Sequence, residues 1–67
     1  MSFIFLIRPV SVEKGFDLSC EGVLRDDVRY RRLIDALGHA LELGRNLDGE
    51  IRIFDVEGSV ADVFPLR

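Results

Sequence analysis

The chain has 67 residues, of which 48% are apolar, and its 9 basic and 12 acidic side chains give a net charge of −3. This length predicts a single domain over residues 1–67, and the apolar fraction excludes a disordered tail. The acidic balance argues against a general nucleic-acid or membrane binder, because phosphate contacts need an excess of Lys and Arg.

The first third of the chain predicts two strands. Residues 3–10 are rich in aromatic and β-branched side chains and are too short for a typical helix. Residues 16–21 alternate apolar and polar side chains, which is the period of a half-buried strand, with Phe16, Leu18 and Cys20 on one face. A short polar turn separates the two segments, so we expect them to form a hairpin.

The middle of the chain predicts one amphipathic helix. Asp26 and Asp27 offer side-chain oxygens and negative charge for the free amides of a first turn. Residues 46–49 supply the signals that end a helix. Between them, apolar or small residues recur every three or four positions, as on one buried helix face: Tyr30, Leu33, Ile34, Leu37, Ala40, Leu41, Gly44 and Leu47.

The end of the chain predicts a second hairpin. Residues 50–56 and 60–66 are strand-like and flank a turn that contains a glycine. The order is therefore β-β-α-β-β. One helix can cover one face of a four-stranded, mainly antiparallel sheet, so the expected fold is an α+β two-layer sandwich.

A single helix leaves the other face of such a sheet open, and this face gives the first functional hypothesis. If the helix packs on the face that includes Phe5, Leu18 and Ile51, a set of apolar side chains remains as a candidate interface: Ile4, Leu6, Phe54, Val56 and Phe64. A contiguous apolar patch usually marks an interface, although scattered residues or bent strands are the alternative. We predict a small non-catalytic interaction module that uses a sheet face or edge to form a homodimer or to bind another protein.

One basic cluster gives an alternative function. Arg29, Arg31 and Arg32 surround Tyr30, and an aromatic ring between arginines can stack on a single nucleic-acid strand. Neighbouring aspartates cancel much of the positive field of this cluster. A weak nucleic-acid-binding site on this face of the helix is the second hypothesis, and a solvated helix face is the simpler interpretation.

Candidate catalytic and ligand-binding residues are few. Cys20 and His39 are the only thiol and the only imidazole, so a nucleophile–base pair needs both. The strand alternation directs Cys20 towards the helix, whereas the helical spacing directs His39 towards water. The acidic residues do not follow a calcium-loop pattern, and the glycines do not follow a phosphate-loop pattern. We therefore expect no enzyme, cofactor or metal site, and a small hydrolase or redox protein that uses Cys20 is the third hypothesis.

The cysteine count and the apolar runs bear on location. One cysteine cannot form an intramolecular disulfide, which excludes a disulfide-stabilised secreted domain. The longest apolar run, residues 3–7, is too short to span a bilayer and lacks the basic flank of a signal peptide. We expect a soluble cytoplasmic protein.

The order of the segments also resembles known domains. Residues 30–44, followed by residues 49–58, resemble small bacterial domains of unknown function that have a hairpin, one helix with an alanine-rich stripe, and a closing hairpin with an Asp-x-x-Gly turn. This resemblance implies a β-β-α-β-β fold and no known activity. The strand–helix order is similar, more weakly, to antitoxin-type partner-binding domains and to double-stranded-RNA-binding folds.

Overall fold

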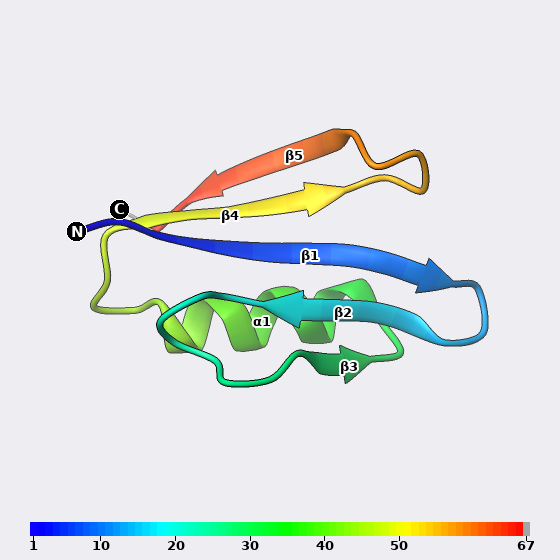
Figure 1. The fold of residues 1–67 in the computed structure, drawn as a ribbon, viewed down its shortest axis with the longest axis horizontal. Coiled ribbons are helices and arrows are strands. Elements are labelled where there is room, and N and C mark those ends of the chain that lie inside the picture. The colour runs from blue at the N-terminus through cyan, green and yellow to red at the C-terminus, as the bar shows by residue number, and fades with distance from the viewer. Residues whose placement is uncertain (67) are drawn as a thin grey trace.

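One helix packs on one face of a five-stranded sheet in the computed structural model of the protein, which describes residues 1–66 (Figure 1). The elements in chain order are β1 (Phe3–Ser11), β2 (Gly15–Ser19), β3 (Val28–Tyr30), α1 (Leu33–Leu43), β4 (Gly49–Phe54) and β5 (Val60–Pro65). The predicted α+β class, with one helix on a sheet, is confirmed. The sheet has one strand more than the predicted four.

The sheet is mixed, in the order β3-β2-β1-β4-β5. The pairs β1–β2, β2–β3 and β4–β5 are antiparallel, but the central pair β1–β4 is parallel. Figure 1 shows the reason: α1 carries the chain back to the end of the sheet where β1 begins, so β4 starts beside β1 and runs in the same direction. The antiparallel strands β1, β2 and β3 are thus joined to the β4–β5 hairpin through the parallel pair β1–β4, which we call the parallel seam.

Strand β3 occupies positions that the sequence assigns to the beginning of the helix. Its Tyr30 lies beside Phe16 of β2. Its Val28 lies beside Leu18, so both apolar side chains of β3 share the face of the β2 core residues. Three residues are too few to separate a period of 2 from a period of 3.6. Pairing with the free edge of β2 therefore decides that this segment is a strand.

Helix α1 consequently begins later than predicted. Its N-cap residue is Arg32, which is extended (φ −118°, ψ 139°) and makes no side-chain capping hydrogen bond. Asp26 and Asp27, which the sequence suggests as caps, are exposed in the connection between β2 and β3. The predicted cap was wrong because β3 separates these aspartates from the helix.

The hydrophobic core lies between α1 and the sheet. Its buried side chains come from β1, β2, the residue that follows β2, α1 and β4: Phe5, Ile7, Leu18, Cys20, Ala36, Ala40, Ile51 and Ile53. These strand residues share the face that the helix covers, which is the arrangement on which the candidate interface depends. Two of the core positions in α1 are alanines, and small side chains at a contact let a helix approach closely.

Gly49 fixes the start of the parallel seam. Its φ is +147°, and a Cβ atom at this position would lie 1.8 Å from the carbonyl oxygen of Phe3. The amide of Phe3 donates a hydrogen bond to the carbonyl of Asp48 (2.8 Å). Because the backbones of β1 and β4 approach so closely here, only glycine allows β4 to begin at this point.

Candidate functional site

The helix leaves one face of the sheet uncovered, and we call this the open face. Side chains alternate along each strand, so the register assigns to it the residues that point away from the core. They come from all five strands: Ile4, Leu6, Arg8, Asp17, Ser19, Arg29, Glu50, Arg52, Phe54, Val60, Val63 and Pro65. The face mixes apolar side chains with charges of both signs.

Three of the five candidate interface residues share the open face. Ile4 is exposed there, and Leu6 and Phe54 are half-buried. Val56 is 89% exposed, but it lies in the turn between β4 and β5 rather than on a strand. The structure therefore brings together the β1 and β4 members of the predicted set.

Phe64 lies on the other side of the sheet, which corrects the prediction. It is paired with Ile51 and packs against the core. A shift of one residue in register moves a side chain to the opposite face, and the register between β4 and β5 shifts between Ile53 and Phe54. Val63, the neighbour of Phe64, occupies the open face instead.

An ion pair joins β2 and β3 on the open face. Arg29 Nε lies 2.9 Å from Asp17 Oδ1, and the Arg29 terminal nitrogen Nη2 lies 3.2 Å from Asp17 Oδ2, so the contact is bidentate. The hydrogen bond from Arg29 lowers the pKa of Asp17 below its ordinary value. Because Asp17 alternates with apolar neighbours, the sequence places its side chain on the face opposite Phe16 and Leu18. The sequence does not identify Arg29 as its partner, because the two residues meet only when β3 forms a strand beside β2.

The other two arginines of the open face also have partners. Arg52 donates from Nε to Glu50 Oε2 within β4. The guanidinium carbon of Arg8 lies 5.0 Å from the centroid of the Phe54 ring, across the seam between β1 and β4. Among residues 1–66, every arginine on the open face therefore interacts with another residue of the same face.

The predicted basic cluster does not form one face of a helix. Arg29 belongs to β3 and is held by Asp17 on the open face. Arg31 and Arg32 are exposed in the connection between β3 and α1. The cluster is dispersed because the segment that carries it changes from strand to helix within four residues.

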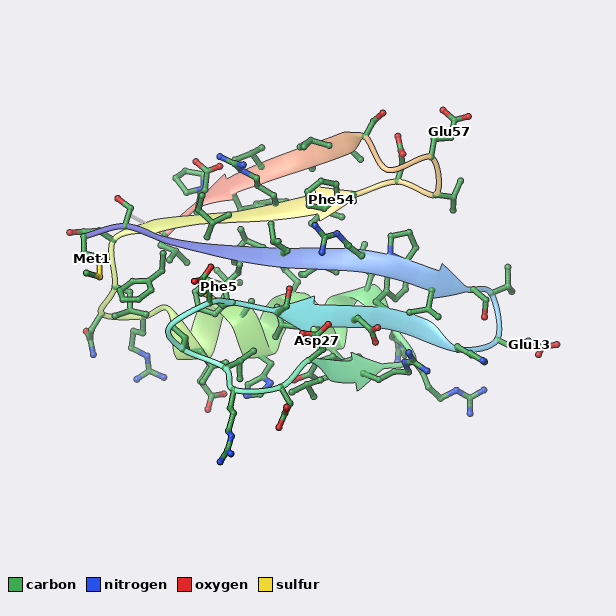
Figure 2. All side chains as sticks on the ribbon, viewed as in Figure 1. Met1, Phe5, Glu13, Asp27, Phe54 and Glu57 are labelled. Carbon is green, nitrogen blue, oxygen red and sulfur yellow. The ribbon has the colours of Figure 1, made fainter. Side chains whose placement is uncertain are left out.

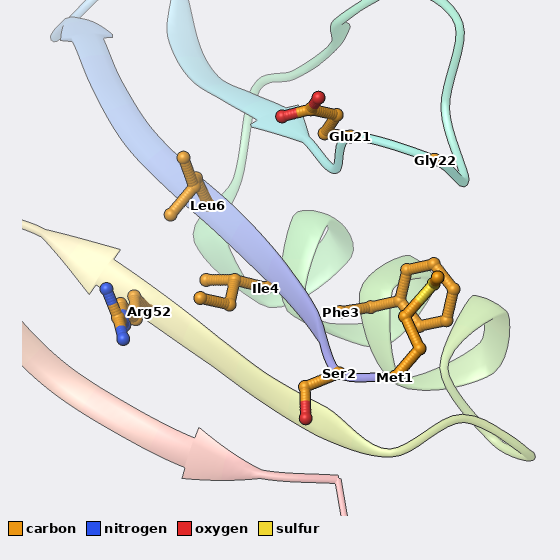
Figure 3. Close-up of a pocket in the computed structure, with 8 residues that line it drawn as sticks. All are labelled: Met1, Ser2, Phe3, Ile4, Leu6, Glu21, Gly22 and Arg52. Carbon is orange, nitrogen blue, oxygen red and sulfur yellow. The ribbon is translucent and has the colours of Figure 1, made fainter.

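A hollow of about 560 Å³ lies at the N-terminal end of the open face (Figure 3). Ile4 and Leu6 of β1 line it together with Arg52 of β4. Glu21 and Gly22, from the connection after β2, lie on its other side (Figure 3). The hollow belongs to the open face, and its apolar lining there is formed by Ile4 and Leu6 of β1.

Cys20 and His39 have separate environments. Cys20 is buried, its Sγ lies 3.8 Å from the carbonyl oxygen of Glu21, and burial raises the pKa of the thiol. The helical spacing predicts that His39 faces water, but in the structure its side chain is half-buried. Its Nδ1 is hydrogen-bonded to the hydroxyl of Tyr30, which β3 brings to the side of α1. His39 therefore has Tyr30, not Cys20, as the hydrogen-bond partner of its Nδ1, and the Cys20 thiol lies inside the core.

Residues 1–66 contain neither a cluster of metal-ligating side chains nor a membrane-spanning helix. In this part of the chain, no group of three or more His, Cys, Asp or Glu side chains is placed to hold a metal ion. Its single helix is neither long enough nor apolar enough to cross a bilayer.

Comparison with known proteins finds no match to this chain among protein-family models, curated proteins or solved structures.

Proposed function

We propose that this protein is a non-catalytic interaction module whose open face binds a second copy of the chain. The observation that carries the proposal is the pairing of charges on a face that still exposes apolar side chains. Burying such a face removes apolar surface from water. Four of its five charged groups are already in ion pairs, which offsets part of the cost of removing water from them, and the fifth, Arg8, lies over the ring of Phe54.

The size of the face suits a pair of copies. The Cα atoms span 33 × 21 × 18 Å, and Figure 1 looks down the shortest of these axes onto the sheet. The two longer dimensions bound the projected area of this face at on the order of 700 Å² per copy, the same order as the roughly 800 Å² of accessible surface that each partner contributes to a stable interface.

The distribution of charge also favours contact between two copies. In a two-fold contact the same surface lies on both sides, so each charge of the face meets the charges of an identical face. The open face carries three arginines and two carboxylates, whereas the whole chain has a net charge of −3. The acidic surplus therefore lies elsewhere, and two open faces meet without strong repulsion.

The edges of the sheet are less suited to pairing than its open face. On β5, the amide of Val63 donates to Asp62 Oδ1 (2.9 Å), and Pro65 has no amide hydrogen. On the opposite edge, β3 has only three residues. Short edge strands, prolines and blocked amides all weaken the addition of another strand. We therefore favour the face over the edge.

Sedimentation equilibrium over a wide range of concentrations tests the proposal. Leu6→Glu places a charge in the middle of the open face beside Arg52, where a single copy can accommodate it. We expect this variant to remain folded and to shift towards monomer. Ile34→Glu is the matched control, because Ile34 is 65% exposed on α1. A wild-type chain that is monomeric throughout, or equal association of both variants, would contradict the proposal.

A further inference from the structure

The two hairpins separate at the end of the sheet where β1 and β4 finish. The parallel pairing of β1 and β4 ends at Ile7 and Ile53. Beyond this point β1 continues beside β2 to Ser11, while the chain after Phe54 turns towards β5. Figure 2 shows the tips of both hairpins, marked by Glu13 and Glu57, at the same end of the molecule.

This separation opens a cleft of about 430 Å³ between the hairpins, which we call the hairpin cleft. The residues that matter for its chemistry are Val10, Val12, Phe16, Phe54, Asp55 and Val56. Ligand-binding clefts start at about 300 Å³ and are mostly apolar with a few polar groups. The hairpin cleft has that size and that composition.

Both hairpins are irregular where they border the cleft. The register of β1 with β2 shifts between Pro9 and Ser11, which makes Val10 an extra residue in β1. The register of β4 with β5 shifts between Ile53 and Phe54. Such bulges redirect side chains and are frequent beside binding sites. Here the extra residue of the first bulge, Val10, lines the cleft, and the second bulge lies opposite Phe54, which lines it as well.

The walls of the cleft carry valines where turns usually carry polar residues. Val12, in the turn of the first hairpin, is fully exposed, and Val56, in the turn of the second, is 89% exposed. Val10 is also exposed. These three side chains come from hairpins that are distant in the sequence, and they give an occupant an apolar surface on both sides.

A carboxylate is fixed at the rim of the cleft. Asp55 Oδ1 accepts hydrogen bonds from the amides of Glu57 (2.9 Å) and Ser59 (3.0 Å), and these bonds hold the turn. Among the described residues, no cation forms an ion pair with Asp55 or Glu57. The position of the carboxylate is thus set by the turn, while its charge has no cationic partner there.

Asp55 is the one charged residue among the described residues that line the cleft. Other charges of both signs lie near this end: Glu13 and Lys14 on the turn of the first hairpin, Glu57 on the turn of the second, Arg8 over the ring of Phe54, and Arg31 beside Gly15. With Asp55 these groups are three acidic and three basic, so the negative charge is local to the cleft lining and comes from Asp55. A cationic group beside Asp55 is therefore favoured over an anionic one.

We infer that the hairpin cleft binds an extended basic segment of a partner protein, with the stem of a lysine side chain against the valines and its ammonium group facing Asp55. A lysine side chain combines an aliphatic stem with a compact charge, and it commonly lays that stem on apolar surface. It matches a cleft with apolar walls and one fixed carboxylate. This site adjoins the open face at Phe54, which belongs to both, and it does not depend on self-association.

The test is a titration followed by backbone amide chemical shifts. The probe is the capped peptide acetyl-Val-Lys-Val-Lys-Val-amide, and two matched peptides carry norleucine or glutamate in place of lysine. We expect saturable shifts confined to residues 10–16 and 54–58. The lysine peptide should bind about fivefold more tightly than the norleucine peptide, as expected for a partly exposed charge pair. The glutamate peptide should bind most weakly.

Three variants separate the charge from the apolar walls. Asp55→Asn keeps the Oδ1 acceptor for the turn and removes the charge, so the lysine and norleucine peptides should then bind equally. Val12→Ser should weaken the binding of both peptides. Asp35→Asn is the control, because it removes one negative charge from the exposed surface of α1. This control should keep the wild-type preference.

Three results would overturn the inference. The first is equal binding of the lysine and norleucine peptides to the wild-type chain, or a preference that survives Asp55→Asn. The second is a set of shifts on the open face instead of the hairpin cleft. The third is a change at Val10, Val12 and Asp55, which line the cleft but not the open face, when the protein alone is diluted, because this would identify a second copy as the occupant.

Discussion

The hydroxyl of Tyr30 and Nδ1 of His39 are hydrogen-bonded, and their rings meet edge to face with centroids 5.7 Å apart. This contact joins β3, the strand at one edge of the sheet, to the middle of α1. It lies beside the core, where a polar pair is satisfied within the protein rather than by water.

Loss of the Tyr30 hydroxyl should destabilise the fold. Tyr30→Phe keeps the ring and removes the hydrogen bond, so we expect the free energy of unfolding in urea to fall by about 1 kcal/mol. The same substitution in a His39→Leu background, where no side-chain hydrogen bond to the Tyr30 hydroxyl is possible, measures the coupling between the two side chains. Equal effects of Tyr30→Phe in both backgrounds would show that the pair contributes nothing to stability.

Two glycines should respond to alanine in opposite directions. Gly49→Ala places a Cβ against the Phe3 carbonyl at a positive φ, so we expect a loss of more than about 3 kcal/mol or failure to fold. Gly38 lies in α1, and a Cβ there meets nothing within 4 Å. Gly38→Ala should raise stability by about 0.5–1 kcal/mol. Thermal unfolding of both variants checks this, and similar effects at the two positions would contradict it.

The ion pair of Asp17 with Arg29 should make stability depend on acidity. The pKa of Asp17 is lower in the folded protein than its ordinary value, so the unfolded chain binds more protons in the acid range. The stabilising contribution is present at neutral pH and is lost as the pH falls below about 4. It should be small, because the pair lies at the surface.

A comparison of the wild-type chain with Asp17→Asn isolates this contribution. Urea unfolding at neutral pH and in acid should show a smaller loss of stability in the variant than in the wild-type chain. Asp27→Asn, in the exposed connection before β3, serves as the control. If Asp17→Asn and Asp27→Asn change the acid response equally, the pair does not account for it.

Cys20 should be protected from thiol reagents in the folded state. Its side chain is 2% exposed and burial raises the pKa of its thiol, so little reactive thiolate is accessible at neutral pH. We expect labelling at least about a hundredfold slower than in denaturant, at a rate limited by opening of the core. Rapid labelling of the native protein would show that Cys20 is reactive, and it would support a hydrolase or redox function that uses this thiol.

The sequence alone determined which strand residues share a face, and the position of the helix decided which of the two faces is the core. The alternation around Leu18 and Cys20, and the apolar positions Phe5, Ile7 and Ile51, are patterns that depend only on neighbouring residues. The same patterns place Ile4, Leu6 and Phe54 on the opposite face. Because the period of a strand is a local property, these assignments did not need knowledge of which strands pair.

The tertiary structure alone decided the features that depend on pairing between distant segments. Val28–Tyr30 became a strand because β2 had a free edge, and this moved the helix start past Asp26 and Asp27. The register between β4 and β5 set the face of Phe64, and the parallel seam of β1 and β4 set where the two hairpins diverge. Local periodicity carries no information about register or neighbours. The arginine contacts of the open face and the hairpin cleft therefore depend on which strands lie side by side, and the tertiary structure alone determines that.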